Sequence, residues 1–151
     1  RRCFDAALAA TMFLAMLVWI APVRAADLDP SHIVYKLPNQ IHWTGGAASQ
    51  RATLLGDPSK PGLYIILIKW NPHNFSRPHF HSTDRYITVL SGTWWVSSSD
   101  VYDPDKTVPM PAGSFVTDLA KGIHYDGAKD EPAVIEIVGM GPVTNTPAEK
   151  K

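Results

Sequence analysis

The chain has 151 residues, of which 45% are hydrophobic and 19% are charged, a composition typical of one globular domain. Its 14 basic and 14 acidic residues give a formal net charge of zero, so it has no basic excess to neutralise a nucleic-acid backbone. These values argue against a disordered protein, a collagen-like fibre, a multi-span membrane protein and a nucleic-acid-binding protein. The 13 prolines and 10 glycines favour short strands and turns over long helices.

The N-terminal segment 1–25 has the features of a secretory signal peptide. Two arginines precede an uncharged apolar stretch over residues 6–23, and small residues follow it. Val23 and Ala25 would fill the two small-residue positions of a cleavage site. We therefore predict cleavage after Ala25, with an uncleaved membrane anchor as the alternative. Cleavage would remove Cys3, the only cysteine, and would give a secreted, periplasmic protein without disulfides.

Downstream of this leader, short apolar runs separated by turn residues predict strands. The runs cover residues 32–36, 41–44, 63–70, 86–90, 93–96, 114–117 and 133–138. Gly92 separates two of them and predicts a β-hairpin, and residues 119–123 could form one helical turn. The polar residues 144–151 are typical of a disordered tail. The pattern predicts one all-β domain over residues 26–143, a small sandwich or barrel.

Two histidines carry the strongest chemical signal in the chain. His79 and His81 are two residues apart, and on a strand such residues point to the same face, about 6–7 Å from each other. Two imidazoles placed in this way can bind one metal ion at about 2.1 Å each. Pro78 forces the residue before it into an extended conformation, which suits the start of a strand. An isolated His-x-His pair is equally consistent with two surface histidines, so the context decides.

That context resembles the cupin superfamily, in particular its small secreted single-domain members. The first cupin motif contains His-x-His, then a glutamate and then a glycine, and the second contains Pro-x-Gly followed by a histidine. The matching positions in this chain are His79, His81, Gly92, Pro111, Gly113 and His124. The resemblance covers residues 30–143 and implies a cupin-like double-stranded jelly-roll barrel with a metal ion in its mouth. It also implies that His79, His81 and His124 are the metal ligands and that the protein forms a homodimer, as many cupins do.

The chain departs from the cupin pattern at three positions. His73 stands where the first motif begins with glycine, Arg85 occupies the position of the acidic ligand, and His124 comes later than the histidine of the second motif. Arg85 cannot bind a metal, because its guanidinium stays protonated. Pointing into the pocket it would favour an anionic or chelating substrate, and pointing outward it would pair with Asp84. Asp84 itself would reach the metal only if the register slipped by one residue.

Two classes of function follow from these features. The first is a metal-dependent oxidoreductase of the dioxygenase type, in which a small oxygen-chelating substrate binds one divalent ion, with Fe(II) favoured and Mn, Zn, Ni or Cu open. Its candidate catalytic residues are Arg85 and Glu136. Glu136 lies among apolar residues of a predicted strand, so it is either exposed or the only carboxylate in the pocket. The second class is a non-catalytic periplasmic module that binds or senses a small molecule or a metal. Neither class needs a nucleic acid, or a membrane once the leader is cleaved.

Overall fold

The computed structural model describes residues 27–151, so the predicted signal peptide and its cleavage site lie outside the described residues. The chain divides into two units, Arg1–Val34 and Tyr35–Lys151. The described part of the first unit is a turn in which the Ile33 amide donates to the Asp29 carbonyl at 2.9 Å. The strand expected over residues 32–36 does not form. Among residues 27–151, no helix has the length and apolar character needed to cross a membrane.

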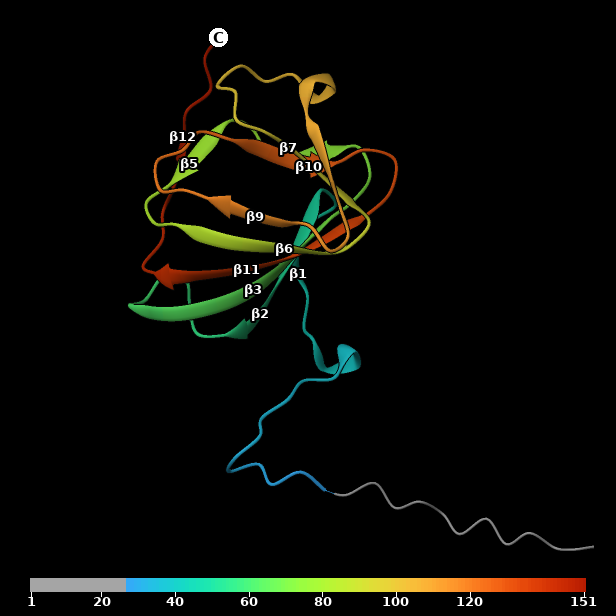
Figure 1. Ribbon diagram of the computed structural model, residues 1–151, viewed down its shortest axis with the longest axis vertical. Coiled ribbons are helices and arrows are strands. Elements are labelled where there is room, and N and C mark those ends of the chain that lie inside the picture. Colours follow the sequence, from blue (N-terminus) through green and yellow to red (C-terminus); the bar gives the residue numbers. More distant parts are fainter. Residues whose placement is uncertain (1–26) are drawn as a thin grey trace, which may run out of the picture. The chain divides into compact units, whose positions relative to one another are not determined.

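The second unit consists of antiparallel sheets, as the sequence predicts (Figure 1). The largest has six strands, in the spatial order β1 (Thr44–Gly45), β2 (Ser49–Leu55), β3 (Gly62–Trp70), β11 (Ala133–Gly141), β6 (Arg85–Ser91) and β9 (Phe115–Asp118). The second has four, in the order β4 (Asn74–Phe75), β10 (Tyr125–Ala128), β7 (Thr93–Ser97) and β8 (Val108–Pro111). The third pairs β12 (Asn145–Pro147) with β5 (His79–His81). Two short 3₁₀ turns, η1 (Pro38–Gln40) and η2 (Pro104–Lys106), complete the described elements.

The core lies between the two larger sheets, because both contribute buried side chains to one cluster. Alternate residues of β3 and β11 point inward, as the two-residue period of a strand requires. The most buried members of the cluster are Tyr64, Ile87, Val89, Trp94, Ala128, Ala133 and Ile135. The predicted strand over residues 63–70 is confirmed as β3, which has a paired strand on each side.

The hairpin predicted at Gly92 is wrong, although both of its strands exist. β6 pairs with β11 and β9, whereas β7 pairs with β8 and β10, so the chain leaves one sheet and enters the other at Gly92. This residue has a φ of 68°, in the left-handed region that favours glycine. A side chain there would also collide with the Pro132 carbonyl. Gly92 therefore forms a corner between sheets.

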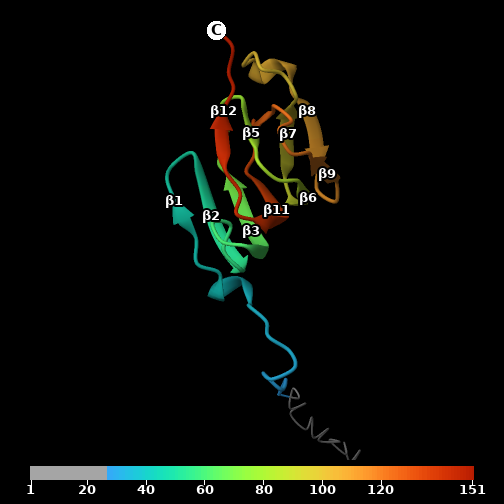
Figure 2. The same ribbon diagram turned by 90° about the vertical axis from the view of Figure 1, so that its left-hand side faces the viewer.

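The disordered tail predicted over residues 144–151 is also wrong. Residues 145–147 form β12, which runs beside β5 (Figure 2). Beyond it, the Ala148 amide donates to the Pro78 carbonyl at 2.9 Å, and Glu149 forms an ion pair with Arg77. The edge of β5 offers free backbone groups to any extended segment, whether that segment is apolar or polar. The C-terminal segment is thus part of the fold next to His79 and His81.

Candidate metal centre

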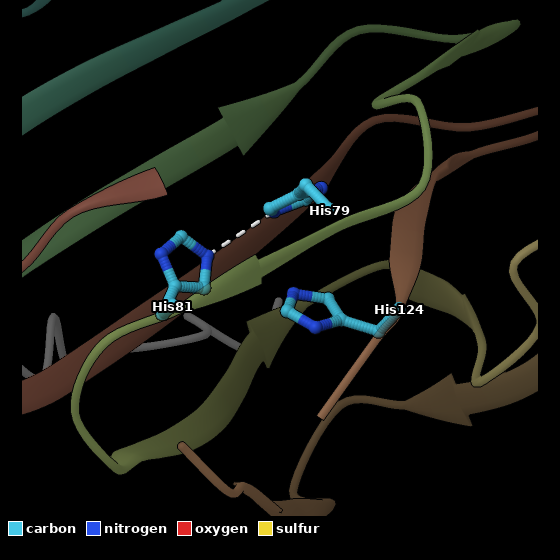
Figure 3. Close-up of side chains that lie close together, drawn as sticks. All are labelled: His79, His81 and His124. Carbon is cyan, nitrogen blue, oxygen red and sulfur yellow. Dashed lines mark hydrogen bonds between the residues drawn. The ribbon is translucent and has the colours of Figure 1, made fainter. Parts of the chain in front are cut away.

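Three histidines from two distant parts of the chain meet at one point (Figure 3). His79 and His81 project from the same face of β5, and His124 immediately precedes β10. The backbones of His79 and His124 bind each other in both directions, at 2.9 Å each. One ring nitrogen from each of the three side chains lies within 4.8 Å of the others, and all three residues are buried. These residues could hold a metal ion.

Each ring engages its Nδ1 atom with the backbone, so Nε2 is the atom that would bind a metal, and Nε2 of His124 also accepts from Arg85 Nη2 at 3.3 Å. Each Nδ1 contacts a backbone carbonyl: His79 that of Arg77 at 2.7 Å, His81 that of Thr144 at 3.1 Å and His124 that of Gly122 at 3.1 Å. A carbonyl only accepts, so each Nδ1 carries a proton, and a ring without a second proton has its lone pair on Nε2. This arrangement is typical of metal-binding histidines.

Two of these nitrogens are close enough for both to bind one metal ion. Nε2 of His79 and Nε2 of His81 are 3.1 Å apart. If both carry lone pairs, the contact is repulsive unless a proton or a metal ion lies between them. Burial lowers the pKa of His79, and it lowers the pKa of His81 to about 3, which disfavours a proton at neutral pH. The residues present therefore fit a divalent metal ion that accepts imidazole ligands.

Arg85 points into the site and pairs with Asp118. The Arg85 Nε donates to Asp118 Oδ2 at 2.7 Å, and Arg85 Nη2 is 2.6 Å from the same oxygen. The other oxygen of Asp118 is 3.2 Å from His124 Nδ1, and Arg85 Nη2 is 3.3 Å from His124 Nε2. The Arg85 and Asp118 side chains are 12% and 9% exposed. Asp118 thus joins the guanidinium to the third imidazole, a role that the sequence did not reveal.

Two alternatives from the sequence are excluded by this arrangement. Arg85 does not turn outward onto Asp84, whose carboxylate instead accepts from the Ala120 amide at 2.7 Å. Asp84 is exposed and is not part of the histidine cluster.

The catalytic role expected for Glu136 is also wrong. Its neighbours in β11, Ile135 and Ile137, are buried on the inner face, so Glu136 points to the opposite face of the sheet.

A cavity of about 440 Å³ opens beside the cluster. His81, Arg85 and Thr144 line it together with apolar residues of β3 and β11, among them Ile66 and Ile137. Its volume is in the range of small-molecule sites. His73, which stands where the first cupin motif begins with glycine, is an exposed loop residue with a φ of 62° and does not belong to the cluster.

Acidification is expected to destabilise the metal-free protein. The pKa values of His79 and His81 are lowered by burial, that of His81 to about 3, whereas an unfolded histidine titrates near pH ~6.5. Below that pH the unfolded chain binds more protons, so the free energy of unfolding falls by up to about 1.4 kcal/mol per pH unit for each histidine. For His81 the loss continues down to about pH 3, and above pH ~6.5 neither contributes.

Urea unfolding between pH 7 and pH 5 in the presence of a chelator would measure this slope. The variant His81→Gln should show a shallower dependence, because it lacks one of the two buried imidazoles. An identical slope in the variant and the wild type would contradict the assignment.

Comparison with known proteins supports the architecture. No protein-family model matches the chain, and no curated protein matches it in sequence. Solved structures do match. The polyketide cyclase RemF from Streptomyces resistomycificus has a TM-score of 0.60 at 15% identity, over 75% of this chain and 84% of that one. KdgF from Halomonas sp. has a TM-score of 0.58 at 15% identity, over 71% and 94% of the two chains.

A cupin-2 domain from Rhodospirillum rubrum has a TM-score of 0.59 at 12% identity, over 79% of this chain and 80% of that one. Another neighbour, from Klebsiella pneumoniae, is described as a double-stranded β-helix protein; it has a TM-score of 0.58 at 16% identity and covers 78% of this chain and 97% of that one. At these identities the likeness concerns the fold. This likeness in fold agrees with the two cupin motifs found in the sequence and with the two larger sheets that face each other in the structure. The chain is a protein of the cupin fold, a double-stranded β-helix.

Proposed function

We propose that this protein is a metal-dependent cupin enzyme whose small substrate binds the metal through two oxygen atoms. The convergence of three imidazole nitrogens beside a cavity of small-molecule size is the observation that carries the proposal. His79, His81 and His124 would hold the ion. Three neutral imidazoles cancel none of its charge, so oxygen anions are the ligands that suit its remaining positions.

The residues around the cluster would orient the substrate. A divalent ion would supply a Lewis acid that polarises the chelating oxygens, and as Fe(II) it would add a redox-active centre for dioxygen. Arg85 places a positive charge beside the same position and would stabilise negative charge on a substrate oxygen. Asp118 holds that guanidinium at 2.7 Å, so its position is fixed before the substrate arrives. Ile66 and Ile137 line the cavity and would limit the access of water.

The finer assignment, an Fe(II)-dependent dioxygenase, is our proposal for the reaction. A chelating substrate that becomes electron-rich on losing a proton, such as a β-diketone or a catechol, would react with dioxygen, and both oxygen atoms would enter the product. The cyclase named among the structural neighbours supports the more general view that this fold can carry small-molecule chemistry.

The test is the metal content of the purified protein followed by oxygen uptake. We expect about one divalent ion per chain, and oxygen consumption with a diketone or catechol when the protein is loaded with Fe(II) but not with Zn(II). Tight ligand binding without turnover under either metal would favour the non-catalytic binding module instead. Substoichiometric metal after reconstitution would overturn the proposal altogether.

A further inference from the structure

Tyr64 presents a free hydroxyl group to the cavity. The residue is 1% exposed, and among residues 27–151 its hydroxyl makes no hydrogen bond, although Tyr64 lines the cavity that holds His81 and Arg85. Every fully buried side-chain oxygen or nitrogen of the described residues has a hydrogen-bond partner. Because the Tyr64 hydroxyl has none, it is not fully buried, and it is accessible from the cavity. A buried phenol normally finds a hydrogen-bond partner. The cavity is the place from which that partner would come.

The absence of a side chain at Gly139 leaves room for the Tyr64 ring in the cavity. Gly139 lies between Tyr64 and Arg85 in the register of three neighbouring strands, β3, β11 and β6. A Cβ atom at Gly139 would stand 2.5 Å from the Tyr64 oxygen, so the phenol lies across this glycine. Burial raises the pKa of Tyr64 above its usual range. The hydroxyl is therefore a protonated donor at neutral pH, suited to an anionic acceptor.

Arg51 adds a positive charge to the same cavity without a carboxylate partner. The described residues contain three arginines: Arg77 pairs with Glu149 and Arg85 pairs with Asp118, whereas Arg51 forms no ion pair. Arg51 lies on β2 opposite Ile68, and both residues line the cavity.

Among residues 27–151, the only carboxylate that lines the cavity already has other partners. Asp57 accepts from the amide and the hydroxyl of Ser59 at 2.9 Å and 2.7 Å, and Lys60 lies 3.6 Å from it. Arg51 is thus left with charge to share with a ligand. One guanidinium and one neutral hydroxyl match a singly charged carboxylate better than a phosphate dianion, half of whose charge would stay unpaired.

We propose that Arg51 and Tyr64 bind a carboxylate group at the end of the substrate that does not contact the metal ligands. The substrate class is then a small organic acid with oxygen ligands at one end and a carboxylate at the other. This inference rests on the proposed function, because it assumes that the chelating end lies at the histidine cluster. It extends that function by naming two residues that select the substrate.

The test compares succinate with its monoamide by isothermal titration of the zinc-loaded protein. We expect the wild type to bind succinate more tightly, and Arg51→Gln to weaken succinate binding by about tenfold or more and to lose the preference. Arg51→Lys should recover part of it. Tyr64→Phe keeps the ring over Gly139 and should weaken binding by about threefold to tenfold. The matched control is Arg77→Gln, an exposed arginine outside this cavity, which should bind succinate like the wild type.

Three results would overturn this inference: equal affinity of the wild type for succinate and its monoamide, an undiminished preference in Arg51→Gln, and no succinate binding at millimolar concentration. Tighter binding of inorganic phosphate than of succinate would show that the carboxylate class is wrong. Zinc content is measured in every sample. If zinc does not bind, the proposed function fails, and the same titrations on the zinc-free protein still decide whether Arg51 and Tyr64 recognise a carboxylate.

Discussion

Replacing His124 by alanine is expected to remove the bound metal, from about one ion per chain to nearly none after dialysis. The variant keeps only two of the three ring nitrogens that lie within 4.8 Å of one another, and it leaves Asp118 without the imidazole that it contacts. Loss of a partner behind a ligand already weakens metal binding by about 10–100-fold. Loss of the ligand itself should therefore weaken zinc affinity by at least about a hundredfold, measured by competition with a chelating dye.

The exposed histidine His42 supplies the matched control for this experiment. His42→Ala removes an imidazole from the same chain, outside the cluster, and should leave zinc affinity unchanged. Circular dichroism of both variants without metal establishes that they fold. The backbone bonds between His124 and His79 do not involve the side chain, so β5 should stay in place. A folded His124→Ala variant with nearly wild-type affinity would rule out the proposed centre.

Strong local patterns made part of this architecture predictable. β3 could be found because most of its residues are apolar. β6 and β7 could be found because two short apolar runs lie on either side of Gly92. β2 was missed because Ser49–Leu55 is largely polar and partly exposed, which gives no clear alternation. The pairing of β6 and β7 with other strands was missed because a glycine corner between sheets has the same local signature as a hairpin turn.

The site was predictable where one residue type carries the chemistry. His79 and His81 could be proposed because their spacing places them on one face of a strand, and His124 could be added because the chain resembles the cupin motifs. Asp118 could not, since its contact with Arg85 depends on the register in which β6 and β9 face each other. Thr144 contacts His81 through its backbone carbonyl. Every residue has such a carbonyl, so the sequence cannot indicate this contact. Glu136 was misplaced because a strand of apolar residues does not tell which of its faces is the inner one.

One buried carboxylate connects the two larger sheets. Asp126 of β10 is buried, and its Oδ2 accepts from the indole nitrogens of Trp70 and Trp94, each at 2.9 Å. Its Oδ1 accepts from the Ser76 hydroxyl at 2.9 Å, and the Ser76 oxygen accepts from the Asp126 amide at 3.0 Å. Trp70 lies in the six-stranded sheet and Trp94 in the four-stranded one. The carboxylate therefore connects the two layers through their largest side chains.

Asp126→Ala is expected to lower the free energy of unfolding by about 3 kcal/mol. It leaves two buried indole donors and one hydroxyl without an acceptor, and each such loss costs about 1–3 kcal/mol. Because burying a charge is itself unfavourable, removing the carboxylate offsets part of this destabilisation. Asp126→Asn keeps an oxygen for the two indoles and should lose only about 1–2 kcal/mol. Urea unfolding followed by tryptophan fluorescence measures both, with the exposed Asp130→Ala as the control. If the alanine and asparagine variants were as stable as this control, the carboxylate would not connect the sheets.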